Sequence, residues 1–131
     1  MVTDIDIKDA VYALISSSEL PSLISGHVYK DSRPLNSDKE DISISVLAGD
    51  AAQAQSFVLN VNLFVPDVNR GNDHIEDSPR LRTLCSKCAE VLHNKVVGGF
   101  WYRLDWQRVM AVNEADFHFI NNRLNVACCN G

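Results

Sequence analysis

The stretch from Ser56 to Val65 constrains the fold of this chain more than any other segment. Large apolar side chains alternate along it with a second set in which serine and asparagine are common. Side chains of a β-strand point alternately to its two faces, so this pattern predicts a strand with one face in a hydrophobic core. Pro66 lacks an N–H donor and therefore marks the end of the strand. The expected core set is Phe57, Leu59, Val61, Leu63 and Val65.

Further strands are expected on both sides of this segment in the sequence. Ile42 to Val46 alternates with its isoleucines on one side. Residues 48–55 are small and polar, which predicts a hairpin with a long, mobile tip. The other expected strands are residues 27–30, as a short edge strand, Phe100–Trp106 and Phe117–Cys128. In the second of these, Tyr102, Leu104 and Trp106 fall on one side, and residues 107–115 either continue the strand or turn away.

Two amphipathic helices are also expected. Asp6 is the predicted N-cap of the first helix, which carries apolar residues at helical spacing, namely Ile7, Ala10, Val11, Leu14 and Ile15. Ser78 is the predicted N-cap of the second helix, with Pro79 at its first position. Its apolar stripe comprises Leu81, Leu84, Cys85, Cys88, Val91 and Leu92. Residues 20–24 are expected to add one short turn.

The order of these elements predicts an α+β fold. We expect residues 1–131 to form a single domain, with an antiparallel sheet of four to five strands and the two main helices packed on one face. Residues 31–38 and 66–78 are expected to be polar loops. Apolar residues make up 46% of the chain and charged residues 22%, which are ordinary values for a globular protein.

Charge and hydropathy argue against several classes of partner. The net charge is −5 and no run of Lys or Arg offsets it, which argues against a nucleic-acid-binding surface, and we expect no sequence-specific nucleic-acid partner. No segment approaches the roughly 20 apolar residues of a membrane span. The start of the chain is acidic and lacks the pattern of a signal peptide. The four cysteines are therefore expected to be reduced in a cytosol.

Cys85 and Cys88 form a C-x-x-C pattern, which occurs in redox pairs and zinc sites. A zinc site would need Cys128 and Cys129 as its second half, and adjacent cysteines fit a tetrahedral site poorly. Both Cys85 and Cys88 also lie on the apolar stripe of the second helix, where a free cysteine packs as a small hydrophobe. We therefore expect both cysteines to pack in the hydrophobic core, and we expect no metal and no cofactor.

Residues 67–77 are rich in acidic side chains and include His74, which suggests a calcium loop. Counted from Asp67, however, the sixth position is Asn72 and the twelfth is Ser78, whereas an EF-hand requires Gly and Glu there. The four histidines lie far apart in the sequence, and no nucleophile motif accompanies them. His118 shares a side with Ile120 and is expected to be a core histidine with a hydrogen-bond partner. The sequence therefore does not predict an enzyme.

A row of uncharged polar side chains faces away from the expected core. A solvent-facing sheet usually carries Lys, Glu, Thr and Arg, but only one of these side chains is charged. The pattern fits either an ordinary solvent face or a surface that meets another subunit, where charge is depleted. The candidate interface comprises Ser43, Ser45, Asn60, Asn62, Asn121, Arg123 and Asn125.

From Asp6 to about Ala127 the chain resembles the small tail-completion (tail-terminator) proteins of tailed bacteriophages and prophages. The resemblance rests on the order of elements more than on invariant residues. The segments that carry it are the helix Asp6–Ile15, the segment Gly26–Pro34, the strands Ile42–Val46 and Phe57–Val65, the helix Leu81–Leu92 and the strand Phe117–Val126.

The resemblance implies a structural, non-enzymatic protein. In that family the subunits form a ring, commonly of six, at the head-proximal end of the tail. The implied partners are other copies of the chain, the major tail-tube protein and neck or connector proteins, without a membrane. The implied location is the bacterial cytoplasm during assembly and then the tail or neck of the virion. One alternative is a cytosolic module of α+β fold that binds a small ligand or a protein, and a weaker one is a hydrolase or metal enzyme built on the loop around His74.

Overall fold

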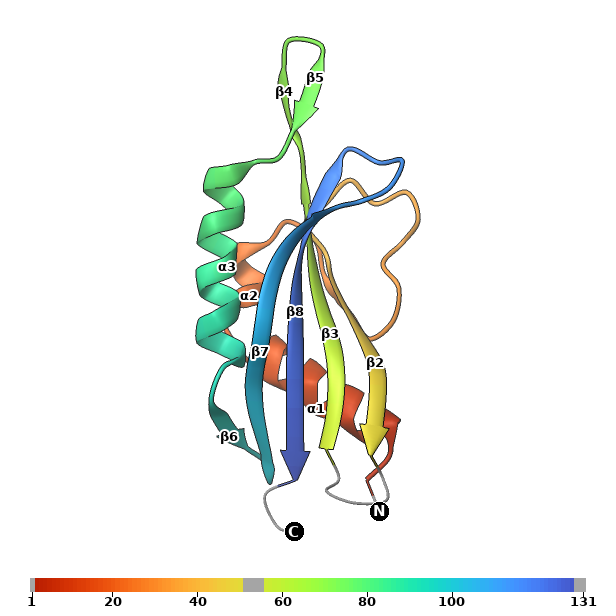
Figure 1. Ribbon diagram of the computed structural model, residues 1–131, viewed down its shortest axis with the longest axis vertical. Coiled ribbons are helices and arrows are strands. Elements are labelled where there is room, and N and C mark those ends of the chain that lie inside the picture. The colour runs from red at the N-terminus through yellow and green to blue at the C-terminus, as the bar shows by residue number, and fades with distance from the viewer. Residues whose placement is uncertain (1, 51–55, 129–131) are drawn as a thin grey trace.

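The computed structural model describes residues 2–50 and 56–128, and a six-stranded sheet forms its centre (Figure 1). The strands lie in the order β1-β2-β3-β8-β7-β6. Their bounds are Val28–Tyr29 (β1), Ile42–Asp50 (β2), Ser56–Pro66 (β3), Lys95–Val97 (β6), Phe100–Ala111 (β7) and Phe117–Cys128 (β8). Part of the predicted hairpin tip, residues 51–55, lies outside the described residues. The rest of that segment continues β2 to Asp50.

The alternating segment forms the inner strand β3, as predicted. Its burial alternates at every position, and each expected core residue is 2% exposed or less. β3 pairs antiparallel with β2 on one side and with β8 on the other, in a register that sets Leu59 between Val46 and Leu124. Because directly opposed residues share a face, the register gathers the apolar side chains of all three strands on one side of the sheet.

The predicted number of strands and their uniform direction were wrong. β1 runs parallel to β2, which makes the sheet mixed, and β6 adds a short strand that pairs with the start of β7. Each has only two or three residues, too few for a period-two pattern. β7 continues past Trp106 to Ala111, which is one of the two courses that the sequence left open for this segment.

Three helices accompany the sheet: α1 (Asp4–Ser16), α2 (Leu20–Leu23) and α3 (Ser78–Leu92). α1 crosses behind the strands in Figure 1 and α3 lies along the β7 side. Both predicted N-caps were wrong. Thr3 caps α1 through a capping box, in which Asp6 is the reciprocal partner and not the cap. Asp77 caps α3 by accepting a hydrogen bond from the Arg80 N–H at 3.2 Å.

The helices and the sheet enclose one hydrophobic core. α1 contributes Ile7, Val11 and Ile15, and α2 contributes Leu20. α3 contributes Leu81, Leu84, Cys88, Val91 and Leu92, which confirms the predicted stripe except that Cys85 is only half-buried. In the described ranges, no helix is both long enough and apolar enough to cross a membrane.

The predicted polar loop after β3 contains a second, two-stranded sheet. β4 (Val68–Arg70) and β5 (Asp73–Ile75) form a hairpin that projects beyond the main sheet (Figure 1). Gly71 lies at its turn with a φ of 66°, a conformation that favours glycine. Expecting a loop here was wrong because the pairing depends on the turn, and most side chains in the hairpin are exposed and polar.

Strand β7 contains a bulge that changes the expected facing of its side chains. Leu104 lies opposite Leu124, but the next pair in the register is Trp106 and Arg123, so Asp105 is the extra residue. Tyr102 is buried in the core as expected. The bulge, however, turns Trp106 to the face away from the helices. Grouping Trp106 with Leu104 was therefore wrong.

Two buried carboxylates in the segment between β1 and β2 bind neighbouring parts of the protein. Glu40 accepts hydrogen bonds from Nε and Nη2 of Arg80 on α3, at 2.7 and 2.8 Å. Asp41, which is 1% exposed, accepts one from the backbone N–H of His27 at 3.1 Å. Gly26 passes so close that a Cβ there would overlap the Asp41 side chain. This junction therefore requires glycine.

Candidate functional site: the outer face of the sheet

All seven candidate interface residues lie on the outer face, which we define as the face of the main sheet away from α1 and α3. The register aligns Ser43, Asn62 and Asn121 across three neighbouring strands. Asn121 Nδ2 donates a hydrogen bond to Asn62 Oδ1 at 2.6 Å. On the far side of Asn121, β7 places Arg108. The first polar row therefore crosses the sheet and ends on a cation.

A second row runs parallel to the first and consists of Ser45, Asn60, Arg123 and Trp106. Arg123 Nε donates to Asn60 Oδ1 at 3.0 Å. The guanidinium of Arg123 lies 4.7 Å from the centre of the Trp106 ring, and that of Arg108 lies 5.7 Å from it. Both distances are within the range of cation–π attraction. We call Arg108, Trp106 and Arg123 the Arg-Trp-Arg cluster.

The last candidate, Asn125, lies opposite Val58 on β3 and Arg103 on β7. Its Oδ1 accepts a hydrogen bond from the Ser56 hydroxyl at 3.2 Å. Asn121 is only 5% exposed, although it faces away from the core. Three pairs of polar side chains on this face are thus bonded across β3 and β8.

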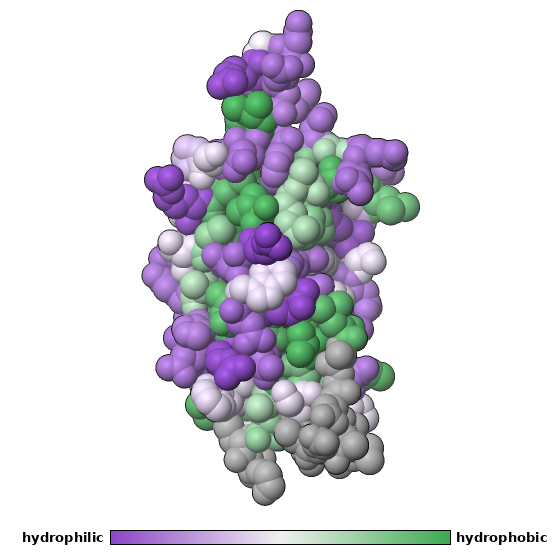
Figure 2. All heavy atoms as spheres, in the orientation of Figure 1, coloured by the Kyte–Doolittle hydropathy of each residue, from purple (hydrophilic) through white to green (hydrophobic). Residues whose placement is uncertain are grey.

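Aromatic side chains extend the outer face toward the end where β3 stops. The rings of Phe64 and Phe119 lie 5.4 Å apart, and the Arg33 guanidinium lies 4.5 Å from Phe64 and 4.4 Å from Phe117. A pocket of about 350 Å³ opens beside them, lined also by Leu35. Figure 2 shows hydrophilic groups across the middle of the face, with hydrophobic groups above and below.

Sequence reasoning missed the residues that β7 adds to this face. Trp106 and Arg108 were not among the candidates because the alternation of β7 breaks at Asp105, whereas Arg103 lies before the break and its outward position was predictable. No motif marks a bulge of this kind, since its position depends on how β8 pairs with β7. The excess of arginine over acidic residues from 101 to 110 was the available signal.

Asn122 is a second missed residue, on the opposite face of β8. It is fully buried beneath α3. Its Nδ2 donates to the carbonyl oxygen of Val61 at 3.0 Å, and its Oδ1 accepts from Gln107 Nε2 at 2.8 Å. Gln107 also donates to the Cys85 carbonyl oxygen at 3.0 Å. These bonds join the sheet to α3 inside the core, where an unpaired amide would be costly.

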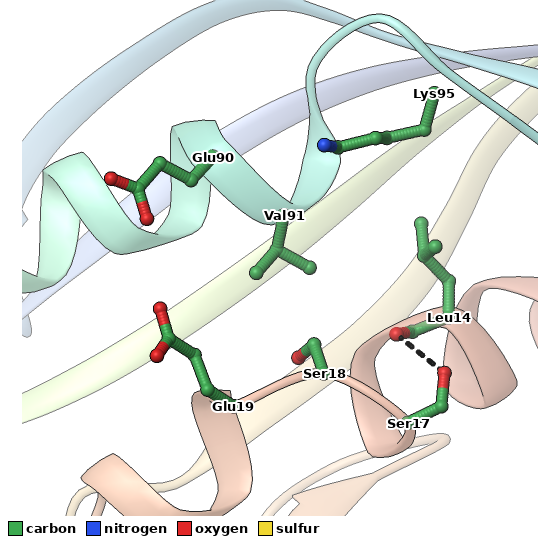
Figure 3. Close-up of a pocket in the computed structure, with 7 residues that line it drawn as sticks. All are labelled: Leu14, Ser17, Ser18, Glu19, Glu90, Val91 and Lys95. Carbon is green, nitrogen blue, oxygen red and sulfur yellow. Dashed lines mark hydrogen bonds between the residues drawn. The ribbon is translucent and has the colours of Figure 1, made fainter.

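A second pocket, of about 400 Å³, lies where the end of α1 approaches the end of α3 (Figure 3). Its carboxylates, Glu19 and Glu90, both pair with Lys87, at 3.0 and 3.5 Å. The Ser17 hydroxyl donates to backbone carbonyls of α1, one of them Leu14 at 3.2 Å. The Ser17 hydroxyl and the two carboxylates are engaged in these contacts. They therefore do not form a nucleophile with an adjacent general base.

His118 and His74 lie apart, and each is close to a different aspartate. His118 is half-buried and its Nδ1 lies 2.7 Å from Asp67 Oδ1, which confirms that it has a hydrogen-bond partner. His74 Nε2 lies 3.7 Å from Asp116 Oδ2 at the surface. Across residues 2–50 and 56–128, no three His, Cys, Asp or Glu side chains come together in a group that could hold a metal ion.

The cysteines of α3 differ in their surroundings. Cys88 is fully buried, and burial raises the pKa of its thiol to about 12, so the thiol stays protonated. Cys85 is half-buried, and burial also raises its pKa. Cys129, which a zinc site would also need, lies outside the described residues.

Cys88→Ala is expected to lower the free energy of unfolding by about 1 kcal/mol, because the smaller side chain leaves a gap in the core. Cys85→Ala serves as the comparison and should cost less, since Cys85 is partly exposed. Urea unfolding of both variants measures the difference. Stoichiometric zinc in the purified protein, with unfolding on chelation, would contradict this assignment.

Neither family models nor the curated proteins give a match to this sequence. Among solved structures, the fold is similar to a chain in the virion of a native gene transfer agent particle. The TM-score is 0.61 at 14% identity, and the similarity covers 93% of each chain. At this identity the likeness concerns the fold.

Proposed function

We propose that this protein is a structural component of a phage-like particle, and that it acts as a tail-completion protein that forms a ring between tail tube and neck. The observation that supports the proposal is the fold likeness to a virion chain over 93% of both lengths. A match over 93% of both chains means that the similarity extends over most of the fold. A local motif would match over a much shorter span.

Two open sheet edges supply a means of ring assembly. β6 pairs with β7 only from Phe100 to Tyr102, and β1 pairs with β2 only at Ile42 and Ser43. In the described part of the chain, the rest of both strands has no strand partner on its outer side. Unpaired strand edges carry free N–H and C=O groups that can pair with another chain.

The directions of the two edge strands suit a head-to-tail arrangement. β2, β3, β8 and β7 alternate in direction, so β2 and β7 are antiparallel. If β7 of one copy lies beside β2 of the next, the pairing continues the same antiparallel pattern. Such a heterologous contact closes into a ring when the rotation between copies permits. The helices would lie on the wider outside of the ring, and the outer face of each sheet would line its channel.

Exposed apolar side chains on both edge strands support this use. Leu47 on β2 is 49% exposed, and Val109 on β7 is 40% exposed. A lysine at both positions should reduce self-association at least tenfold, because each would place an unpaired charge in an edge that loses water when the copies pair. Folding should change little, since substitutions at exposed positions usually shift stability by less than about 0.5 kcal/mol.

Light scattering over a concentration series, with and without a tail-tube protein, tests the proposal. The parent should increase in mass with concentration, and the Leu47→Lys, Val109→Lys double variant should not. The control is Val68→Lys on β4, an exposed apolar position on the hairpin that projects beyond the main sheet. A parent that stays monomeric at high concentration, even with tail-tube protein present, would contradict the ring. If the double variant and the control reduce self-association equally, the sheet edges are not the contact between copies.

A further inference from the structure

We infer that the Arg-Trp-Arg cluster binds the phosphate backbone of duplex DNA without reading its sequence. The inference deepens the proposed function, on which it rests for its biological setting, by assigning a partner to the outer face. The binding itself is a property of the single chain and does not require the ring.

The first support is the distribution of charge. The outer-face positions of β3 and β8, and the positions of β7 opposite them, carry no aspartate or glutamate. They carry Arg103, Arg108 and Arg123, and one acidic residue, Asp105 at the bulge, lies 3.3 Å from Arg103. The chain as a whole has a net charge of −5, so its acidic excess lies on other surfaces. The net charge averages two unlike surfaces, and the outer face is locally basic.

The second support is how the two remaining cations are held. The guanidiniums of Arg108 and Arg123 both lie close to the Trp106 ring, and Arg123 is also bonded to Asn60. Neither arginine has a carboxylate partner among the described residues. Arginine side chains restrained by stacking lose less rotational freedom when they bind an anion. The cluster therefore presents two positioned cations.

The third support concerns the form of nucleic acid. Two guanidiniums already lie 4.7 and 5.7 Å from the centre of the Trp106 ring, so an unpaired base stacking there would compete with them, whereas such stacking is the usual role of aromatic residues in single-strand binding. The neighbouring polar groups are Asn and Ser, which are among the side chains that donate hydrogen bonds to phosphate oxygens. Contacts with the backbone of a duplex, made by arginine and amide groups, fit these residues best.

Fluorescence anisotropy of a labelled 30-base-pair duplex tests the inference, because binding slows the tumbling of the DNA. Binding by the parent should be clear at low salt and weaken steeply as salt rises, because each phosphate contact releases counterions. The double variant Arg108→Gln, Arg123→Gln should bind at least tenfold more weakly. It should also reduce the slope of log K against log salt by about two, one for each lost contact.

The matched control is Arg70→Gln, Arg82→Gln, which removes the same charge from exposed positions on β4 and α3. It should bind DNA like the parent. A second readout uses Trp101→Phe, which leaves Trp106 as the sole tryptophan of the chain. Its emission should change when DNA is added, and should not change with an equal concentration of salt alone.

Several results would overturn the inference. An equal loss of DNA affinity in the Arg70→Gln, Arg82→Gln control would mean that binding depends only on the net charge of the protein. An absence of binding by the parent at 50 mM salt, up to about 200 μM protein, would also overturn it. If, in addition, the Arg108→Gln, Arg123→Gln variant no longer self-associates in light scattering, the cluster is a contact between copies. Because the edge variants are scored without DNA, failure of the ring and failure of DNA binding are separate outcomes.

Discussion

Gly26→Ala is expected to lower the free energy of unfolding by about 3 kcal/mol, a large fraction of the stability of a domain of this size. A Cβ at this position would overlap the Asp41 carboxylate and lie 2.5 Å from the Glu40 carbonyl oxygen. The Gly26 N–H bonds to that same oxygen at 2.9 Å, so the backbone cannot withdraw without losing the bond. The variant must therefore displace two buried acidic residues together.

Gly71→Ala is the matched control. Gly71 has no atom within 4 Å of its would-be Cβ, and its cost arises only from the φ of 66°, about 1 kcal/mol. Urea unfolding of the two variants separates crowding from backbone strain. If Gly26→Ala unfolds at the same urea concentration as Gly71→Ala, the segment from 25 to 41 is less tightly held than the structure indicates.

Asn122→Asp is expected to cost about 3 kcal/mol at pH 8, because it places a carboxylate in the core. The two side chains have nearly the same shape, so packing is preserved. The described partners of Asn122 are an amide, a backbone carbonyl and the Cys88 thiol, and none is a cation. The introduced charge would also face the Val61 carbonyl oxygen, which now accepts a hydrogen bond.

The cost should depend on pH in a definite direction. Burial raises the pKa of the introduced carboxyl in the folded state above its unfolded value of about 3.9. The protonated form therefore favours folding, and the destabilisation is smallest below about pH 4. It grows as pH rises toward the raised pKa and is constant above it. Denaturant unfolding at pH 4 and pH 8 measures the change, with each variant compared with the parent at the same pH.

Asn125→Asp is the control for this pair of measurements. It lies half-buried on the outer face opposite Arg103, and its cost should stay within about 0.5 kcal/mol at both pH values. If Asn122→Asp shows no more pH dependence than this control, water or a cation reaches position 122.

The elements that could be predicted from sequence are those with a long, uninterrupted period. β3 and α3 each carry enough apolar residues at one spacing to define a buried face, and β8 was predicted with its bounds as observed. β1 was expected as a short edge strand, but its parallel direction was not. β6 and the β4–β5 hairpin were missed, since three-residue strands are fixed by their partners and turns more than by their own residues.

The candidate site divides in the same way. The serine and asparagine rows were predictable because β2, β3 and β8 keep strict alternation along these residues. The Arg-Trp-Arg cluster was not, because the phase of β7 changes inside the strand. Asn122 stood in the alternation beside Ile120 and Leu124, so its burial was visible in the sequence and was overlooked.

The bulge at Asp105 has a consequence for aligning this sequence with those of its evolutionary relatives. Deleting that one codon would remove the extra residue and leave Trp106 opposite Arg123 and Gln107 opposite Asn122. A relative without this residue would therefore keep the same inward and outward side chains along β7. An alignment gap placed one residue away from the bulge would instead equate an inward side chain with an outward one. Relatives compared across β7 should be matched by bulge position before their arginines are equated.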